Sequence, residues 1–256
     1  RPQPGLYIFC GDLKLTIEYV HQFGKNGRIN LWQGNETYIF NPNTNKWTLY
    51  KPEDKLKQGI YYGGFYPAVG YYNPFGRGGG RIHLWDYNGT TKIYQPTTNT
   101  WNTYTEQRKI QDGLPAYFKP IVGYYLPNKD GGEIQLFDNS GKMFSFNNRT
   151  NRWEDKTSEQ VSKGLPLGFR PVRGYAFTHT DGKNGRVQLW DKNGRWFVYV
   201  SEKSQWSDYT NLVSKRGLPA GKIPDVGYKD PYKNKVVLWY ENDRYESASG
   251  FNFTKV

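Results

Sequence analysis

One phrase recurs along the chain and limits what it can fold into. Each copy has an apolar run ending in an aromatic residue, a polar turn, and a second run that leads to another aromatic residue: "GRINLWQGNETYIFNPNTNKW", "GRIHLWDYNGTTKIYQPTTNTW", "GEIQLFDNSGKMFSFNNRTNRW", "GRVQLWDKNGRWFVYVSEKSQW" and "NKVVLWYENDRYESASGFNF". The first aromatic residues follow one another in steps of 53, 52, 53 and 49 residues: Trp32, Trp85, Phe137, Trp190 and Trp239. The second ones are Trp47, Trp101, Trp153 and Trp206, with Phe253 as the expected fifth. A period of this length is typical of repeat architectures.

A second shared phrase lies between the copies. It reads "GLPAYFKPIVGYY" from Gly113, "GLPLGFRPVRGYAF" from Gly164, "GLPAGKIPDVGYKD" from Gly217 and, more loosely, "GIYYGGFYPAVGYY" from Gly59. The N-terminal "GLYIFCGDLKLTIEYV" stands where a fifth copy is needed. The register is therefore circular, and the start of the chain supplies the linker that the last copy lacks.

Each unit is predicted to form four short strands. In the second unit we expect strands at 69–72, 82–85, 92–95 and 101–105. The Asn-Gly and Asn-Ser-Gly turns between second and third strands favour tight hairpins, because these residues accept positive φ. The segments "TEQRKIQDG", "SEQVSKG" and "NLVSKRG" are expected to form one helical turn before a terminating glycine.

These patterns predict an all-β, five-bladed β-propeller with repeats of about 51 residues. The 18% aromatic content, 29 Gly and 15 Pro suit short strands and tight turns. The whole chain, 1–256, is expected to be one domain, with units at about 16–66, 67–119, 120–170, 171–223 and 224–256, and with 1–15 closing the ring. Both aromatic series are expected to fill the spaces between blades, because a lone four-stranded sheet cannot cover both of its apolar faces.

The Gly-Leu-Pro at Gly113, Gly164 and Gly217, followed by a strand, a Gly-Arg-led strand and a Trp-bearing strand, resembles the hemopexin-like repeat. That family has Asp-Ala-Ala after Gly-Leu-Pro, four blades and often a closing disulfide, whereas this chain has Val-Gly-Tyr, five copies and one cysteine. The five aromatic-rich and Gly-rich units are also similar to tachylectin-type propeller lectins. That resemblance implies one sugar pocket per unit.

A polar position recurs inside the second strand, at Asn30, His83, Gln135 and Gln188, with Val237 breaking the series. It shares a strand face with the first aromatic series. An amide beside an aromatic ring suits sugar recognition, whereas the alternative is an internal polar residue bonded to the neighbouring blade's backbone. The candidate ligand contacts are Trp85, Trp190, Tyr71, Tyr124, His83 and Gln188.

Catalytic motifs are scarce in the sequence. No nucleophile elbow or zinc motif is present, and the three histidines occupy different repeat positions, so no metal or cofactor is expected. Asp86, Asp138 and Asp191 recur directly after the first aromatic, which predicts turn-capping residues more than catalytic acids. We therefore expect no enzyme activity, although a glycoside hydrolase with paired acids stays open.

The excess of Lys and Arg gives a formal charge of +12, which favours polyanionic partners. No run long enough to span a membrane is present, and the basic residues form no stripe that would indicate nucleic-acid binding. The N-terminus, which lacks Met, and the four sequons favour a secreted protein with glycosylation at Asn35, Asn88, Asn148 and Asn252. The single cysteine, Cys10, allows no intrachain disulfide, which leaves a monomer or a Cys10-linked dimer.

The preferred functional hypothesis is a secreted multivalent lectin that binds glycans or glycoproteins on or between blades. The first alternative is a hemopexin-like scaffold that binds a protein, haem or an ion in the axial channel. The second is adhesion to an acidic polysaccharide, which depends on the charge alone.

Overall fold

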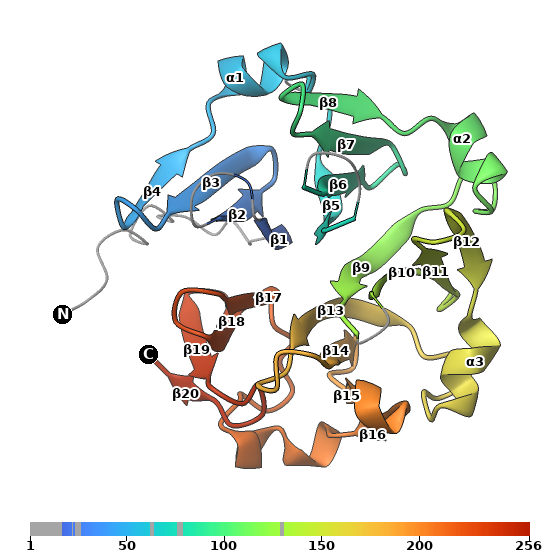
Figure 1. The fold of residues 1–256 in the computed structure, drawn as a ribbon. Coiled ribbons are helices and arrows are strands. Elements are labelled where there is room, and N and C mark those ends of the chain that lie inside the picture. The colour runs from blue at the N-terminus through green and yellow to red at the C-terminus, as the bar shows by residue number, and fades with distance from the viewer. Residues whose placement is uncertain (1–16, 22, 24–26, 62–63, 76–78, 129–130) are drawn as a thin grey trace.

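The computed structural model describes residues 17–21, 23, 27–61, 64–75, 79–128 and 131–256. Five separate sheets each contain four strands in the order of the sequence. They stand in a ring, with α1 (Pro52–Lys57), α2 (Glu106–Gln111) and α3 (Thr157–Ser162) at its outer rim (Figure 1). The protein is thus a five-bladed β-propeller, which confirms the predicted fold class.

The blades take their strands from consecutive stretches of chain. Blade 1 contains β1 (Ile17–His21), β2 (Arg28–Gln33), β3 (Glu36–Asn41) and β4 (Lys46–Leu49). Blade 2 contains β5 (Pro67–Asn73), β6 (Arg81–Asp86), β7 (Thr91–Gln95) and β8 (Thr100–Thr103). Blade 3 contains β9 (Pro120–Leu126), β10 (Glu133–Asp138), β11 (Met143–Asn147) and β12 (Arg152–Asp155). Blade 4 contains β13 (Pro171–Thr178), β14 (Gly185–Asp191), β15 (Trp196–Val200) and β16 (Gln205–Asp208), and blade 5 contains β17 (Val226–Asp230), β18 (Lys235–Tyr240), β19 (Asp243–Ser247) and β20 (Thr254–Lys255).

Hydrophobic clusters fill each of the five spaces between neighbouring blades. Between blades 2 and 3, for example, Trp85 of one blade packs with Leu136 and Trp153 of the next. The same pattern joins blades 1 and 2, 3 and 4, and 4 and 5. A further cluster closes the ring between blades 5 and 1, where Trp239 packs with Leu31. Both aromatic series therefore fill the spaces between blades, as predicted, and Phe253 takes the expected fifth place.

The glycine of the Gly-Leu-Pro phrase is required by contact with the next blade. Gly113 has a φ of +107°, and a Cβ there would lie 2.5 Å from the carbonyl oxygen of Trp153. The preceding carbonyl, of Asp112, accepts a hydrogen bond from the Trp153 N–H at 2.7 Å. Gly59 and Gly164 meet the equivalent tryptophan carbonyls in the same way. The glycine that begins each of these linkers thus contacts the backbone of a second-series tryptophan in the next blade.

The glycine of Val-Gly-Tyr lies where the inner strands converge. A Cβ on Gly123 would lie 2.5 Å from the Leu136 side chain and 2.6 Å from that of Val69 in the preceding blade. The strand register places Glu18 of blade 1 at the same position, opposite Leu31. Blade 1 therefore carries a carboxyl group where the other blades carry a glycine.

The local predictions for blade 2 agree with the strands to within two residues, and β8 ends at Thr103, before the predicted 105. Thr105 instead caps α2, because its Oγ1 accepts a hydrogen bond from the Arg108 N–H. Two of the predicted helical turns are α2 and α3. The third consists of two 3-10 turns, η3 (Thr210–Leu212) and η4 (Ser214–Arg216), while η2 (Ser201–Lys203) and α1 were not predicted.

Two of the sequence expectations fall outside the described residues. These are the closing role of residues 1–15 and the pairing of Cys10. Among the described residues, no helix has the length and apolar character needed to cross a membrane.

Candidate functional site

The six residues predicted to contact a ligand lie inside the propeller. Trp85 and Gln188 are fully buried, and His83, the most accessible of the six, is 9% exposed. Tyr71, Tyr124 and Trp190 line the axial channel, and Trp85 lies between blades 2 and 3. Their burial leaves little of their side chains accessible from outside, and their assignment as ligand contacts stays a prediction.

The polar groups of three of these residues, Trp85, Tyr71 and His83, contact one another. The Trp85 Nε1–H donates to the Tyr71 hydroxyl at 3.1 Å, and His83 Nδ1 lies 3.2 Å from the same hydroxyl. Burial lowers the pKa of His83 to about 3 and raises that of Tyr71 far above its usual value. This group is therefore a neutral, satisfied element of the core.

Equivalent contacts occur in other blades. The Tyr124 hydroxyl donates to Gln135 at 2.7 Å, and the Tyr175 hydroxyl donates to Gln188 at 2.5 Å. The Gln188 Nε2–H also donates to the carbonyl of Gly250 in blade 5 at 2.6 Å. Only this last bond matches the alternative considered above, a polar residue bonded to the next blade's backbone, because the others join strands of one blade.

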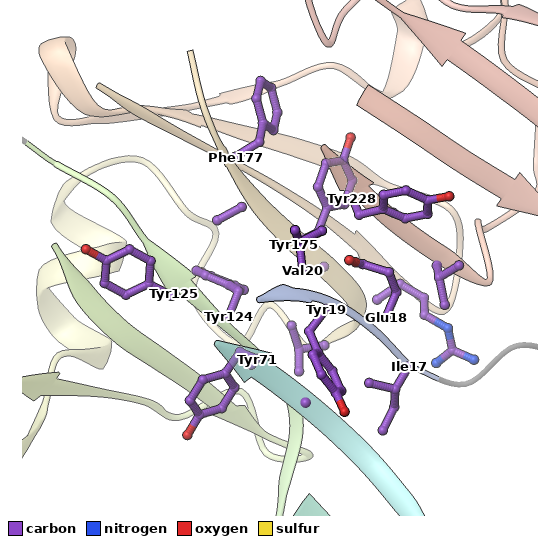
Figure 2. A pocket seen from close by; sticks show the side chains of 18 of the residues that line it. Ile17, Glu18, Tyr19, Val20, Tyr71, Tyr124, Tyr125, Tyr175, Phe177 and Tyr228 are labelled. Atoms are coloured by element: carbon purple, nitrogen blue, oxygen red, sulfur yellow. The ribbon is translucent and has the colours of Figure 1, made fainter. Parts of the chain in front are cut away.

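An axial channel of about 490 Å³ runs between the innermost strands of all five blades. Figure 2 shows Glu18 and Tyr228 among the side chains around it. Glu18 forms no hydrogen bond or salt bridge with the residues that the structure describes, and desolvation raises its pKa well above the usual value. The ammonium group of Lys229, which also lines the channel, donates to the Thr178 carbonyl at 2.8 Å. Within the described part of the chain, no three His, Cys, Asp or Glu side chains gather as a metal site.

A second surface lies at one end of the ring. In an antiparallel sheet with strands in sequence order, the start of the first strand, the second turn and the end of the fourth strand lie at the same end. We call the loop face the surface that these connections form, consisting of residues 34–35, 58–61, 64–66, 87–90, 112–119, 139–142, 163–170, 192–195, 217–223 and 241–242.

Large apolar and aromatic side chains are exposed on the loop face. Their exposed fractions are high: Tyr61 69%, Tyr66 47%, Tyr87 64%, Tyr117 81% and Leu167 86%. Monomeric proteins rarely expose large apolar groups together without a role in recognition. The loop face is therefore the candidate binding surface.

The turns of the loop face are held rigidly. Asp86 Oδ1 accepts hydrogen bonds from the N–H groups of Asn88 and Thr90, at 2.9 and 2.8 Å. Asp138 and Asp191 cap the equivalent turns in blades 3 and 4, as the sequence predicted. These bonds occupy one oxygen of each carboxylate. The need to cap this turn explains why the acid recurs in these three blades.

Tyr117 has an unusual backbone conformation. Its φ is +57°, and it is the only aromatic residue with positive φ in the described part of the chain. The equivalent positions in the next two linkers are Gly168 and Gly221, with φ of +73° and +69°. The Tyr117 N–H donates to Glu106 of α2, which helps to hold the residue in place. An exposed tyrosine thus occupies a position that favours glycine, and no burial of its ring compensates for the strain.

The loop-face residues were missed in the sequence, although a signal was present. When the linkers are aligned, Tyr117 stands where the next two linkers have glycine. When the turns after the first aromatic residues are aligned, Tyr87 stands where the third repeat has Asn139. A bulky residue at a position that packing does not require to be bulky indicates exposure.

The four sequon asparagines differ in their surroundings. Asn88 and Asn252 are exposed and Asn35 is half-buried. The Asn148 Oδ1 accepts a hydrogen bond from Asn73 at 3.3 Å, and its amide nitrogen is buried without a hydrogen-bond partner. Glycosylation at the four positions stays a prediction.

No family model matches the sequence, and no curated protein matches it. Solved structures with a similar fold include the hemopexin-fold protein CP4 from cow pea, with 9% identity, a TM-score of 0.45, and coverage of 75% of this chain and 91% of that one. A plant albumin from Cicer arietinum that shows hemagglutination has 10% identity and a TM-score of 0.43, and the match covers 73% and 86% of the two chains. PorZ, a surface component of the type-IX secretion system of Porphyromonas gingivalis, has 9% identity and a TM-score of 0.44. The match covers 96% of this chain but only 33% of PorZ. At these identities and TM-scores the similarities carry no inference about function.

Proposed function

We propose that this protein is a secreted, non-enzymatic, multivalent carbohydrate-binding protein that contacts glycans through its loop face. The observation that carries the proposal is Tyr117, an 81% exposed aromatic side chain at a strained backbone position. Strained residues persist where another requirement selects them, and binding sites are a common case. A flat aromatic ring with a polar hydroxyl suits sugars, because the ring packs on C–H groups while the hydroxyl forms hydrogen bonds.

Repetition around the ring supports several weak contacts with one glycan. Tyr87 and Tyr117 lie at the junction of blades 2 and 3, and Leu167 lies at the next junction. Weak sites on a rigid frame gain avidity when the ligand has repeating units that reach more than one site. This is the reason to expect a polymeric glycan as ligand.

The test is binding to an array of neutral and acidic glycans, followed by titration of the best ligand. The variant Tyr87→Asn/Tyr117→Gly takes the residues that sister repeats carry, so it keeps the backbone and removes two rings. We expect at least a tenfold loss of affinity, equivalent to about 1.4 kcal/mol. The matched control is Phe75→Ser, which removes an exposed aromatic side chain from the connection between β5 and β6 at the opposite end of the blades and is expected to bind like the parent. Absence of binding to every glycan would refute the proposal.

A second candidate function rests on the axial channel. Its volume of about 490 Å³ and the Glu18 carboxyl in its wall support a scaffold that binds a small ligand, haem or an ion there. Absorption spectra with added haem and elemental analysis of the purified protein test this function. Glu18→Gly, which restores the residue type of the other blades, is expected to abolish such binding without affecting glycan binding.

A further inference from the structure

The charged residues of the loop face are almost all basic. Its exposed cationic side chains are Lys119, Lys142, Arg170, Lys192 and Lys222. Within the segments that define the loop face, the carboxylates are that of Glu241 and that of Asp112, which is bound by the Tyr104 hydroxyl at 2.7 Å and by Arg108. An approaching ligand therefore meets positive charge and aromatic rings together.

These five cations are unneutralised. None of them forms a salt bridge with a residue that the structure describes. Some other cations are paired: Lys163 binds Glu159, Arg186 binds Glu202, and Lys235 binds Glu246. Arg195 shows the contrast within the loop face itself, since its guanidinium donates to the Asp191 carboxylate at 2.6 Å. The loop face therefore carries five exposed positive charges that have no salt-bridge partner among the described residues.

The cations follow the repeat of the blades. A Cβ on Gly89 of blade 2 would lie 3.3 Å from the Lys119 side chain of the next linker, and one on Gly141 of blade 3 would lie 3.5 Å from Arg170. The equivalent Gly194 of blade 4 lies against Gly221, the neighbour of Lys222. Two successive junctions therefore place a cation against a rigid turn, and the third has Lys222 next to the residue that contacts the turn.

We infer that the glycan recognised by the loop face is an acidic polysaccharide, with sulfate or carboxylate groups on repeating units. The inference rests on the proposed function and adds the class of ligand. A polymer matches cations repeated from blade to blade, because each of its units can meet one junction. The rings of Tyr87 and Tyr117 add contacts to the sugar that a simple anion would not use.

The experiment measures affinity for a sulfated polysaccharide, a polyuronate and an uncharged polysaccharide at several salt concentrations. One variant is Lys119→Gln/Arg170→Gln/Lys222→Gln. The matched control, Lys46→Gln/Arg152→Gln/Lys203→Gln, removes the same charge from exposed, unpaired residues at the opposite end of the blades. At about 0.15 M salt, where exposed charges are screened beyond about 8 Å, we expect at least about a tenfold loss for the first variant and less than about a threefold loss for the control.

The outcomes separate the inference from the proposed function. Binding of acidic polymers that weakens with salt and with the loop-face variant alone supports the inference. Salt-independent binding of neutral glycans, unchanged in the loop-face variant, overturns the inference and leaves the proposed function standing. Equal losses in both variants, or tighter binding to anionic vesicles or nucleic acid than to any polysaccharide, also overturn it. Failure to bind any glycan overturns both.

Discussion

Replacing Gly113 by alanine tests the contact that joins one blade to the next. Alanine at a φ of +107° costs about 1–2 kcal/mol in backbone strain. Its Cβ would also lie 2.5 Å from the Trp153 carbonyl oxygen, so the backbones must separate, at a typical overpacking cost of about 1–3 kcal/mol. Alanine also reduces the conformational entropy of the unfolded chain, which offsets about 0.4–1 kcal/mol of this loss of stability. We therefore expect a net loss of about 2–4 kcal/mol in the free energy of unfolding.

Gly168→Ala is the matched control, because it has positive φ, +73°, but nothing within 4 Å of the added Cβ. For this control only the backbone strain and the opposing effect on the unfolded chain remain. We therefore expect Gly168→Ala to lower the free energy of unfolding by about 1 kcal/mol. Urea denaturation followed by tryptophan fluorescence measures both variants, and similar denaturant slopes are needed for the comparison. If Gly113→Ala is no more destabilising than Gly168→Ala, the close approach to Trp153 is not what requires the glycine.

Three further predictions concern buried groups. Because burial raises the folded-state pKa of Glu18 above its ordinary value of 4.5, ionisation of Glu18 destabilises the fold increasingly as pH rises above that value. Glu18→Gln should therefore stabilise the protein at pH 7 to 8 but not at about pH 4. Denaturation midpoints of the parent and the variant at both pH values measure this effect. If the carboxyl were solvated, the two pH values would show no such difference. Tyr71→Phe should cost about 1–3 kcal/mol, because it leaves the buried Trp85 indole N–H without its acceptor, and thermal unfolding measures the loss. When the chain is secreted from a eukaryotic cell, peptide mass spectrometry should find glycan on exposed Asn88 but not on Asn148, and full occupancy of Asn148 would contradict the observed packing of its amide.

The fold could be predicted because packing constrains the same positions in every repeat. Trp85 fills the space between two blades, Asp86 caps the following turn, and Gly113 approaches a backbone carbonyl. Each requirement recurs about every fifty residues, so the sequence shows it repeatedly. The helix α1 was missed because its segment, "KPEDKLKQG", lacks the clear Gly-Leu-Pro phrase that marks the other linkers.

The candidate site could not be predicted in the same way. Alternation along β6 shows that His83 and Trp85 share a strand face, but it cannot tell whether the next blade covers that face. Five-fold closure decides this point, and it buries both residues. Exposure of Tyr117 likewise depends on a backbone conformation set by its neighbours, since Leu114 and Phe118 on either side are buried.

The same packing explains why the binding positions on the loop face need not be alike. Gly113 and Phe118 are fixed by contacts between blades, whereas residue 117 between them is free to vary, and it is tyrosine in one linker and glycine in the next two. One junction therefore offers two tyrosines and a lysine, the next a leucine, an arginine and a lysine, and the third two lysines and an arginine bound to Asp191. A calorimetric titration with a short oligosaccharide should accordingly show unequal sites, and Tyr117→Gly should remove the tightest one while leaving the fold at least as stable. Five identical sites would mean that binding uses the repeated core positions and would refute the assignment to the loop face.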